Sequence, residues 1–217
     1  PYSPAAGTGL SSHELNQPGT YQNVKDTTIV AQFQRVDQPD EYFLAWTTTP
    51  WTLPSNTALA VGAKIDYETI ETFNPYTGSP VKVIMAAALK SKYFSADAEN
   101  GDFENYKPGD KNIPWKVVKT QKGSELEGLK YHQLLPYAQP EDGDAFRVII
   151  GDFVSTEDGT GIVHIAPSFG ADDFRTAKAN GIGSLTLVDK KGKFIECVTD
   201  FAGEYVKESY LTEEEKA

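Results

Sequence analysis

Short apolar runs separated by turn residues dominate this sequence, and they constrain the fold more than any other feature. Runs rich in β-branched and aromatic residues are typical of strands, and Gly, Pro, Asn and Asp between them are typical of turns. The predicted strands are 27–36, 42–49, 57–61, 66–72, 79–86, 115–121, 146–155, 160–166, 184–189 and 193–198. The pattern predicts a mainly β fold with a few short helices, arranged as a closed or nearly closed β-barrel decorated by helices.

Three details refine this prediction. The Asp158-Gly159 pair predicts a hairpin that joins 146–155 to 160–166. Helices are expected at the alanine-rich segment 86–98 and at 171–179, the latter ended by Gly181. The final residues, 210–217, read as the first turns of a further helix.

The 217 residues are expected to form one domain, with 1–25 as an N-terminal connector, 26–200 as the barrel core and 201–217 as a C-terminal connector. The chain begins at Pro1 rather than Met, so we expect it to be excised from a longer protein. It contains no run of about 18 apolar residues, so no membrane-spanning helix is predicted. Cys197 is the only cysteine, which indicates a reducing, cytoplasmic location.

Charge and missing motifs exclude several function classes. With 20 basic and 31 acidic residues the formal net charge is −11, which opposes non-specific binding to a phosphate backbone and leaves open a local contact with one nucleic-acid end. The phosphate loop, the dinucleotide fingerprint and the Gly-x-Ser-x-Gly elbow are absent. His13, His132 and His164 are far apart in sequence. We therefore predict no metal and no cofactor.

The first unusual segment is 47–57, Thr-Thr-Thr-Pro-Trp-Thr-Leu-Pro-Ser-Asn-Thr, which directly follows an apolar strand. One interpretation is a strand edge followed by a rigid turn, because threonine favours strands and proline fixes turns. The other is a rim of hydroxyl and amide groups on a stiff backbone. Such a rim binds a neutral polar group, for example a ribose or an ester carbonyl.

The second unusual segment is 159–174, which contains His164, Asp172 and Asp173. On a strand, His164 shares a face with Ile162 and Ala166, where it is either a structural, partly buried histidine or part of a site. The two aspartates fall in the first turn of the predicted helix, where the helix dipole favours carboxylates for stability alone. One of them can instead receive a ligand ammonium group through a charge-assisted hydrogen bond.

Together, Thr-Thr-Thr-Pro-Trp-Thr-Leu-Pro-Ser-Asn-Thr-Ala-Leu at 47–59 and Gly-Thr-Gly-Ile-Val-His-x-Ala-Pro-x-x-Gly-x-Asp-Asp at 159–173 resemble the editing domain inserted into isoleucyl-tRNA synthetases, which are class I aminoacyl-tRNA synthetases. The resemblance covers about residues 9 to 200. It implies post-transfer editing, in which a positioned water hydrolyses the aminoacyl ester of mischarged valyl-tRNA(Ile). Isoleucine is excluded by pocket size, because one methylene alone discriminates weakly.

The resemblance also implies roles for individual residues. Asp173 holds the α-ammonium group, and His164 lines the side-chain pocket and helps to exclude isoleucine. The stretch that contacts the terminal adenosine and the ester is Thr47, Thr48 and Thr49. The residues that shape the same wall are Trp51, Thr52 and Asn56. The residues expected to act in catalysis are Asp173, Thr48, Thr49 and His164.

The implied partners are the acceptor end of mischarged tRNA(Ile), as valyl-adenosine, and the remainder of the synthetase, with the domain itself monomeric. The motifs of the aminoacylation site are absent, so this chain alone is not expected to charge tRNA. Ser3 and Ala6 stand where many relatives carry zinc-binding cysteines, so no zinc is predicted there. Two alternatives stay open: a folded but catalytically idle module that binds the acceptor end, and a valyl- or leucyl-type editor.

Overall fold

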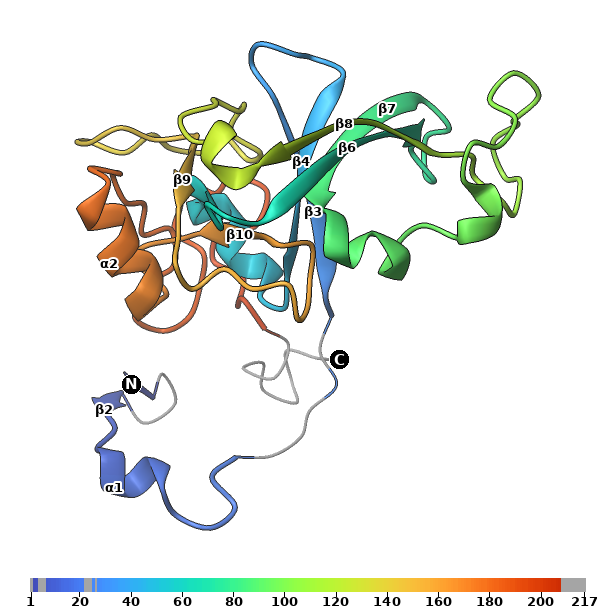
Figure 1. Ribbon diagram of the computed structural model, residues 1–217. Coiled ribbons are helices and arrows are strands. Elements are labelled where there is room, and N and C mark those ends of the chain that lie inside the picture. Colours follow the sequence, from blue (N-terminus) through green and yellow to red (C-terminus); the bar gives the residue numbers. More distant parts are fainter. Residues whose placement is uncertain (1, 4–6, 22–24, 26, 208–217) are drawn as a thin grey trace.

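The computed structural model describes residues 2–3, 7–21, 25 and 27–207 (Figure 1). Near the N-terminus, β1 (Tyr2–Ser3) pairs with β2 (Thr8–Gly9), and the single-turn α1 (Ser12–Leu15) follows. These elements lie apart from the two main sheets in Figure 1. Ala6 and the helix predicted at 210–217 lie outside the described residues.

The larger sheet has five strands in the order β3-β4-β7-β6-β8. Their bounds are β3 Ile29–Gln34, β4 Glu41–Thr47, β6 Asp66–Phe73, β7 Pro80–Ala86 and β8 Lys116–Lys122. Neighbours are antiparallel except β4 and β7, which pair in parallel over three residues. The five corresponding strand predictions are confirmed to within a few residues at each end.

The smaller sheet places β5 (Ala58–Val61) between β9 (Arg147–Ile150) and β10 (Ile162–Ile165). β5 pairs with β9 in parallel and with β10 antiparallel. The predicted hairpin between 146–155 and 160–166 is therefore wrong, because β5 lies between its two arms. All four β5 residues are apolar and buried, and such a strand gains most from a central position with both faces covered.

The mainly β fold with few short helices is confirmed, but neither sheet closes into a barrel among the described strands. A closed barrel would require continuous hydrogen-bond ladders between the two sheets. The described strands show isolated contacts there instead. Beyond the end of β3, Arg35 bridges to Tyr131. On the other side, the Thr160 hydroxyl donates a 2.6 Å hydrogen bond to the Leu44 carbonyl, and the Thr160 carbonyl accepts one of 2.9 Å from the Ala86 amide.

The predicted helix at 171–179 is confirmed as α2 (Ala171–Ala179). The segment 86–98 instead forms two 3₁₀ helices, η2 (Ala87–Lys92) and η3 (Ala96–Ala98), and η4 (Gly123–Glu125) follows β8. The segments 184–189 and 193–198, predicted as strands, instead form isolated bridges, Val188 to Phe194 and Lys193 to Tyr205. There the Asp189 carboxylate accepts the amides of Lys191 and Lys193, which favours a turn over a ladder.

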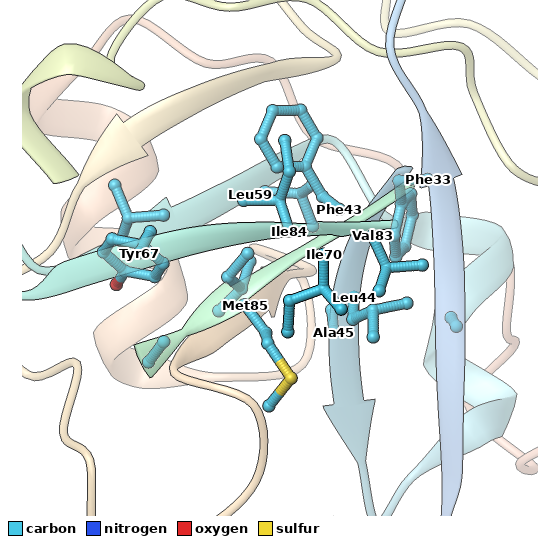
Figure 2. Packing of buried hydrophobic residues seen from close by; sticks show 14 of the residues in the cluster. Phe33, Phe43, Leu44, Ala45, Leu59, Tyr67, Ile70, Val83, Ile84 and Met85 are labelled. Carbon is cyan, nitrogen blue, oxygen red and sulfur yellow. The ribbon is translucent and has the colours of Figure 1, made fainter. Parts of the chain in front are cut away.

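The main hydrophobic core lies between the two sheets, and Figure 2 shows its centre. Phe33, Phe43 and Ile84 are fully buried there. The Tyr67 hydroxyl donates a 2.6 Å hydrogen bond to the Gly161 carbonyl, so a β6 side chain is tied to the start of β10. No helix in the described part of the chain is long and apolar enough to cross a bilayer.

Candidate functional site

The threonine-rich segment begins where β4 ends at Thr47 and continues into the 3₁₀ helix η1 (Pro50–Ser55). Pro50 carries no amide hydrogen, so it cannot extend the strand ladder, and its fixed φ suits the first position of a helix. The Thr47 hydroxyl accepts the Thr49 amide at 3.0 Å, which turns the chain just before Pro50. The local sequence therefore ends the strand and starts the helix within three residues.

Three threonine hydroxyls converge in this turn. Thr47 Oγ1 and Thr49 Oγ1 lie 3.4 Å apart, and Thr49 Oγ1 and Thr52 Oγ1 lie 3.5 Å apart. Thr47 and Thr52 are buried, Thr49 is half-buried and Thr48 is exposed. The interpretation of 47–57 as a rim of hydroxyl groups is thus compatible with the geometry, and Thr48 is its exposed member.

His164, in the centre of β10, joins this cluster from a distant part of the chain. Its Nε2 lies 3.0 Å from Thr52 Oγ1, and the side chain is only 8% exposed. Burial lowers the pKa of His164 to about 4, because the charged imidazolium would lose its hydration. At neutral pH the ring is therefore uncharged, which suits a pocket wall and not a proton carrier.

The two aspartates at the start of α2 occupy different environments. Asp172 is exposed and pairs with Arg175 one turn later. Asp173 is half-buried, and its Oδ2 accepts the Ala166 amide at 2.9 Å, at the end of β10. Burial raises the pKa of Asp173 above its usual value, and among the described residues no cation pairs with it. Asp173 is thus a carboxylate positioned by the fold and left without a positive partner.

Trp51 packs against the turn that precedes α2. Its ring meets Phe169 edge to face, with centroids 5.2 Å apart. This contact joins η1 to the turn between β10 and α2, and so brings the His164 side and the Asp173 side of the site together. The indole Nε1 is buried and has no partner among the described residues.

Asn56 is placed differently from the other predicted wall residues. Its side chain is 2% exposed, its Nδ2 donates to the Ala58 carbonyl at 2.8 Å, and its Oδ1 accepts the Tyr131 hydroxyl at 2.6 Å. These bonds lie inside the protein. Asn56 therefore supports the segment from behind rather than presenting its amide to a ligand.

Among the predicted site residues, the hydroxyls of Thr47, Thr49 and Thr52 form a chain of close contacts, and Thr52 contacts His164. Trp51 and Asp173 both contact the turn at 166–170. Sequence reasoning missed Phe169 and the Ala166 amide. An aromatic residue in the turn that breaks a predicted strand was the available signal for Phe169. A backbone amide leaves no signal in the sequence.

A cavity of about 670 Å³ lies elsewhere, against the five-stranded sheet. Ile29, Leu44, Trp46 and Val83 are among its lining residues, and none of the predicted site residues is. None of the described residues that line it carries a carboxylate or an imidazole. It therefore offers no anchor for an ammonium group, and the threonine–histidine–aspartate cluster stays the candidate site.

No group of three or more His, Cys, Asp or Glu side chains in the described part of the chain is placed to hold a metal ion. Ser3 is described and Ala6 is not, so the expected absence of zinc there stays a prediction.

Comparison with solved structures shows the class of fold. The editing domain of the cytosolic leucyl-tRNA synthetase of P. knowlesi superimposes with a TM-score of 0.52 and 13% identity, over 70% of this chain and 62% of that chain. The fold is thus that of a synthetase editing domain. No family model matches the chain.

Sequence comparison gives the family. The isoleucine–tRNA ligase of Cytophaga hutchinsonii is 64% identical across the whole of this chain, which covers 21% of that protein. That of Bacteroides fragilis is 56% identical over 99% of this chain and 19% of its own length. The whole chain is therefore homologous to a segment of isoleucine–tRNA ligases, and its fold is the one seen in a synthetase editing domain. It spans about a fifth of the length of these curated relatives.

Proposed function

We propose that this domain hydrolyses the aminoacyl ester of valyl-tRNA(Ile) and spares isoleucyl-tRNA(Ile). The observation that carries the proposal is Asp173, a half-buried carboxylate that is fixed by the Ala166 amide and has no cationic partner in the described structure. Every aminoacyl ester carries an α-ammonium group. A carboxylate held in this way binds that group through a charge-assisted hydrogen bond, whatever the amino-acid side chain.

The neighbouring residues supply the rest of the proposed site. Neutral His164 lines the side-chain pocket, and Trp51 contributes to the same wall. Thr47, Thr48 and Thr49 contact the terminal adenosine and the ester.

The attacking group in this proposal is a water molecule. Threonine hydroxyls and the adjacent ribose hydroxyl position it against the ester carbonyl, so proximity and electrostatics supply the catalysis. The acceptor end of the tRNA and the remainder of the synthetase are the proposed partners, and the domain is proposed to act as a monomer.

The test is deacylation of valyl-tRNA(Ile) and isoleucyl-tRNA(Ile) at high domain concentration, with Asp173→Asn as the variant. Asparagine keeps the size of the side chain and removes its charge. Because hydrogen bonds to charged groups contribute about 1.5–3 kcal/mol, loss of valine should slow by roughly tenfold to a hundredfold.

Asp172→Asn is the matched control, because Asp172 is the neighbouring acid on the same helix turn, is exposed and is paired with Arg175. It should leave the rate nearly unchanged. Equal activity in both variants would refute the ammonium anchor. No hydrolysis by the folded wild-type domain would refute the hydrolase and support the idle binding module.

A further inference from the structure

Thr52 has one hydroxyl proton and two hydrogen-bond partners within reach, the Thr49 carbonyl and His164 Nε2. Its Oγ1 donates to the Thr49 carbonyl at 2.8 Å and lies 3.0 Å from His164 Nε2. Both residues are buried, with Thr52 4% exposed. The direction of the contact with His164 therefore depends on which ring nitrogen carries the proton.

If Nε2 carries the proton, the ring donates to Thr52 Oγ1, and Thr52 donates to the Thr49 carbonyl. Both hydrogen bonds form, and Nδ1 is a bare acceptor. If Nδ1 carries the proton, Thr52 must donate to Nε2, and its bond to the Thr49 carbonyl is lost. That carbonyl keeps only the Thr52 amide, at 3.0 Å.

The other ring nitrogen decides between the two arrangements. Nδ1 of His164 is buried and has no partner among the described residues. A buried nitrogen that carries a proton and lacks an acceptor is rarer in folded proteins than an under-satisfied acceptor. The Nε2–H form thus makes one more hydrogen bond and avoids a buried orphan donor.

We propose that Thr52 is a positioning residue that holds His164 as the neutral Nε2–H tautomer and fixes the plane of its ring. The role in specificity rests on the proposed function above: a ring held at a fixed angle makes a rigid pocket wall. A rigid wall excludes an extra methylene better than a ring free to turn.

The direct test is ¹⁵N NMR of protein labelled at histidine. The chain has three histidines, and loss of one pair of signals in His164→Gln assigns the ring. At pH 7 the wild-type spectrum should show Nε2 protonated and Nδ1 bare. A protonated Nδ1 or a doubly protonated ring in the wild type would overturn the inference by itself.

The variant to compare is Thr52→Val, which keeps the branched shape and removes the hydroxyl. The ring should then show a mixture of tautomers or the Nδ1–H form, and Thr52→Ser should restore the wild-type spectrum. Thr69→Val is the matched control, because Thr69 Oγ1 is equally buried and has no partner among the described residues. An unchanged His164 spectrum in Thr52→Val would refute the positioning role.

A second readout connects the tautomer to specificity. Thr52→Val should lower the ratio of kcat/KM for valyl-tRNA over isoleucyl-tRNA by roughly tenfold, the equivalent of one hydrogen bond. An unchanged ratio in an active variant would refute the link to specificity. An inactive wild-type domain would count against the proposed function, and the NMR comparison would still decide this inference.

Discussion

The hydroxyl of Tyr131 donates a 2.6 Å hydrogen bond to Oδ1 of Asn56, which lies 75 residues earlier in the chain. Tyr131 is 2% exposed and packs edge to face on Phe33 of β3, so the bond lies inside the main core. Asn56 follows η1 directly and also bonds the Ala58 carbonyl of β5. The pair thus fixes the end of the threonine-rich segment to the core behind it.

Tyr131→Phe should destabilise the protein. The ring still fills its place, but Asn56 Oδ1 is left buried without a donor, which costs about 1–3 kcal/mol. Urea unfolding should therefore show a lower midpoint with an unchanged slope. Tyr76→Phe is the control, because Tyr76 is 95% exposed and its hydroxyl is hydrated in the folded and unfolded chain alike. Equal midpoints in the two variants would show that the buried bond contributes nothing.

Gly161→Ala should be among the most damaging single changes. Gly161 has φ +73°, and an added Cβ would lie 2.3 Å from the Cβ of Ala86, across the contact that links β10 to β7. Gly181→Ala separates the cost of a positive φ from the cost of the steric clash, because Gly181 has φ +66° but open space around it. We expect Gly181→Ala to cost about 1–2 kcal/mol and Gly161→Ala roughly 2–5 kcal/mol in the free energy of unfolding. Similar losses would mean that the contact with Ala86 relaxes freely.

His164 should make stability depend on pH. Burial lowers its pKa to about 4 in the folded protein, whereas the unfolded chain binds the proton near pH 6.5. Between these values the unfolded state holds more protons, so acid favours unfolding. Protonation of His164 should therefore lower the free energy of unfolding by up to about 3 kcal/mol as pH falls from 7 to 4.

The measurement is the free energy of unfolding against pH, for wild type and His164→Gln. The variant should have a flatter profile between pH 7 and 5. Burial raises the pKa of Asp173, so its contribution runs in the opposite sense at the acidic end, and it is the same in both proteins. Parallel profiles would show that His164 is protonated in the folded state as readily as in the unfolded chain.

His164→Ala should change which ester is hydrolysed. Removing the buried ring opens space beside the threonine cluster, so the proposed pocket should accept one more methylene, a change that discriminates by only about 1–3 kcal/mol. Deacylation of isoleucyl-tRNA(Ile) should appear in the variant while valyl-tRNA(Ile) is still hydrolysed. Continued sparing of isoleucyl-tRNA would remove His164 from the specificity mechanism.

Much of the local structure could be predicted from the sequence. The five strands of the larger sheet and α2 follow from patterns over a few residues, and Thr47–Asn56 and 159–173 contain the residues of the candidate site. A short helix or strand depends mainly on the residues next to it in the chain, so a local sequence pattern is enough to predict it. The hairpin predicted at Asp158-Gly159 is wrong because strand pairing is not a local property. A turn is specified by adjacent residues, whereas strand pairing also depends on how much apolar surface each strand buries. The fully apolar β5 lies between β9 and β10, so these two strands do not pair with each other.

The sequence by itself thus determined the strand-rich composition of the fold, the residue types of the site and the likeness to editing domains. Only the tertiary structure decided that, among the described residues, Asp172 pairs with a cation and Asp173 does not. It also decided that Asn56 faces the core and that Thr52 meets His164 across 112 residues of sequence. These relationships depend on burial and on contacts between distant segments. Desolvation and hydrogen-bond partners are properties of the folded neighbourhood, so no local pattern in the chain specifies them.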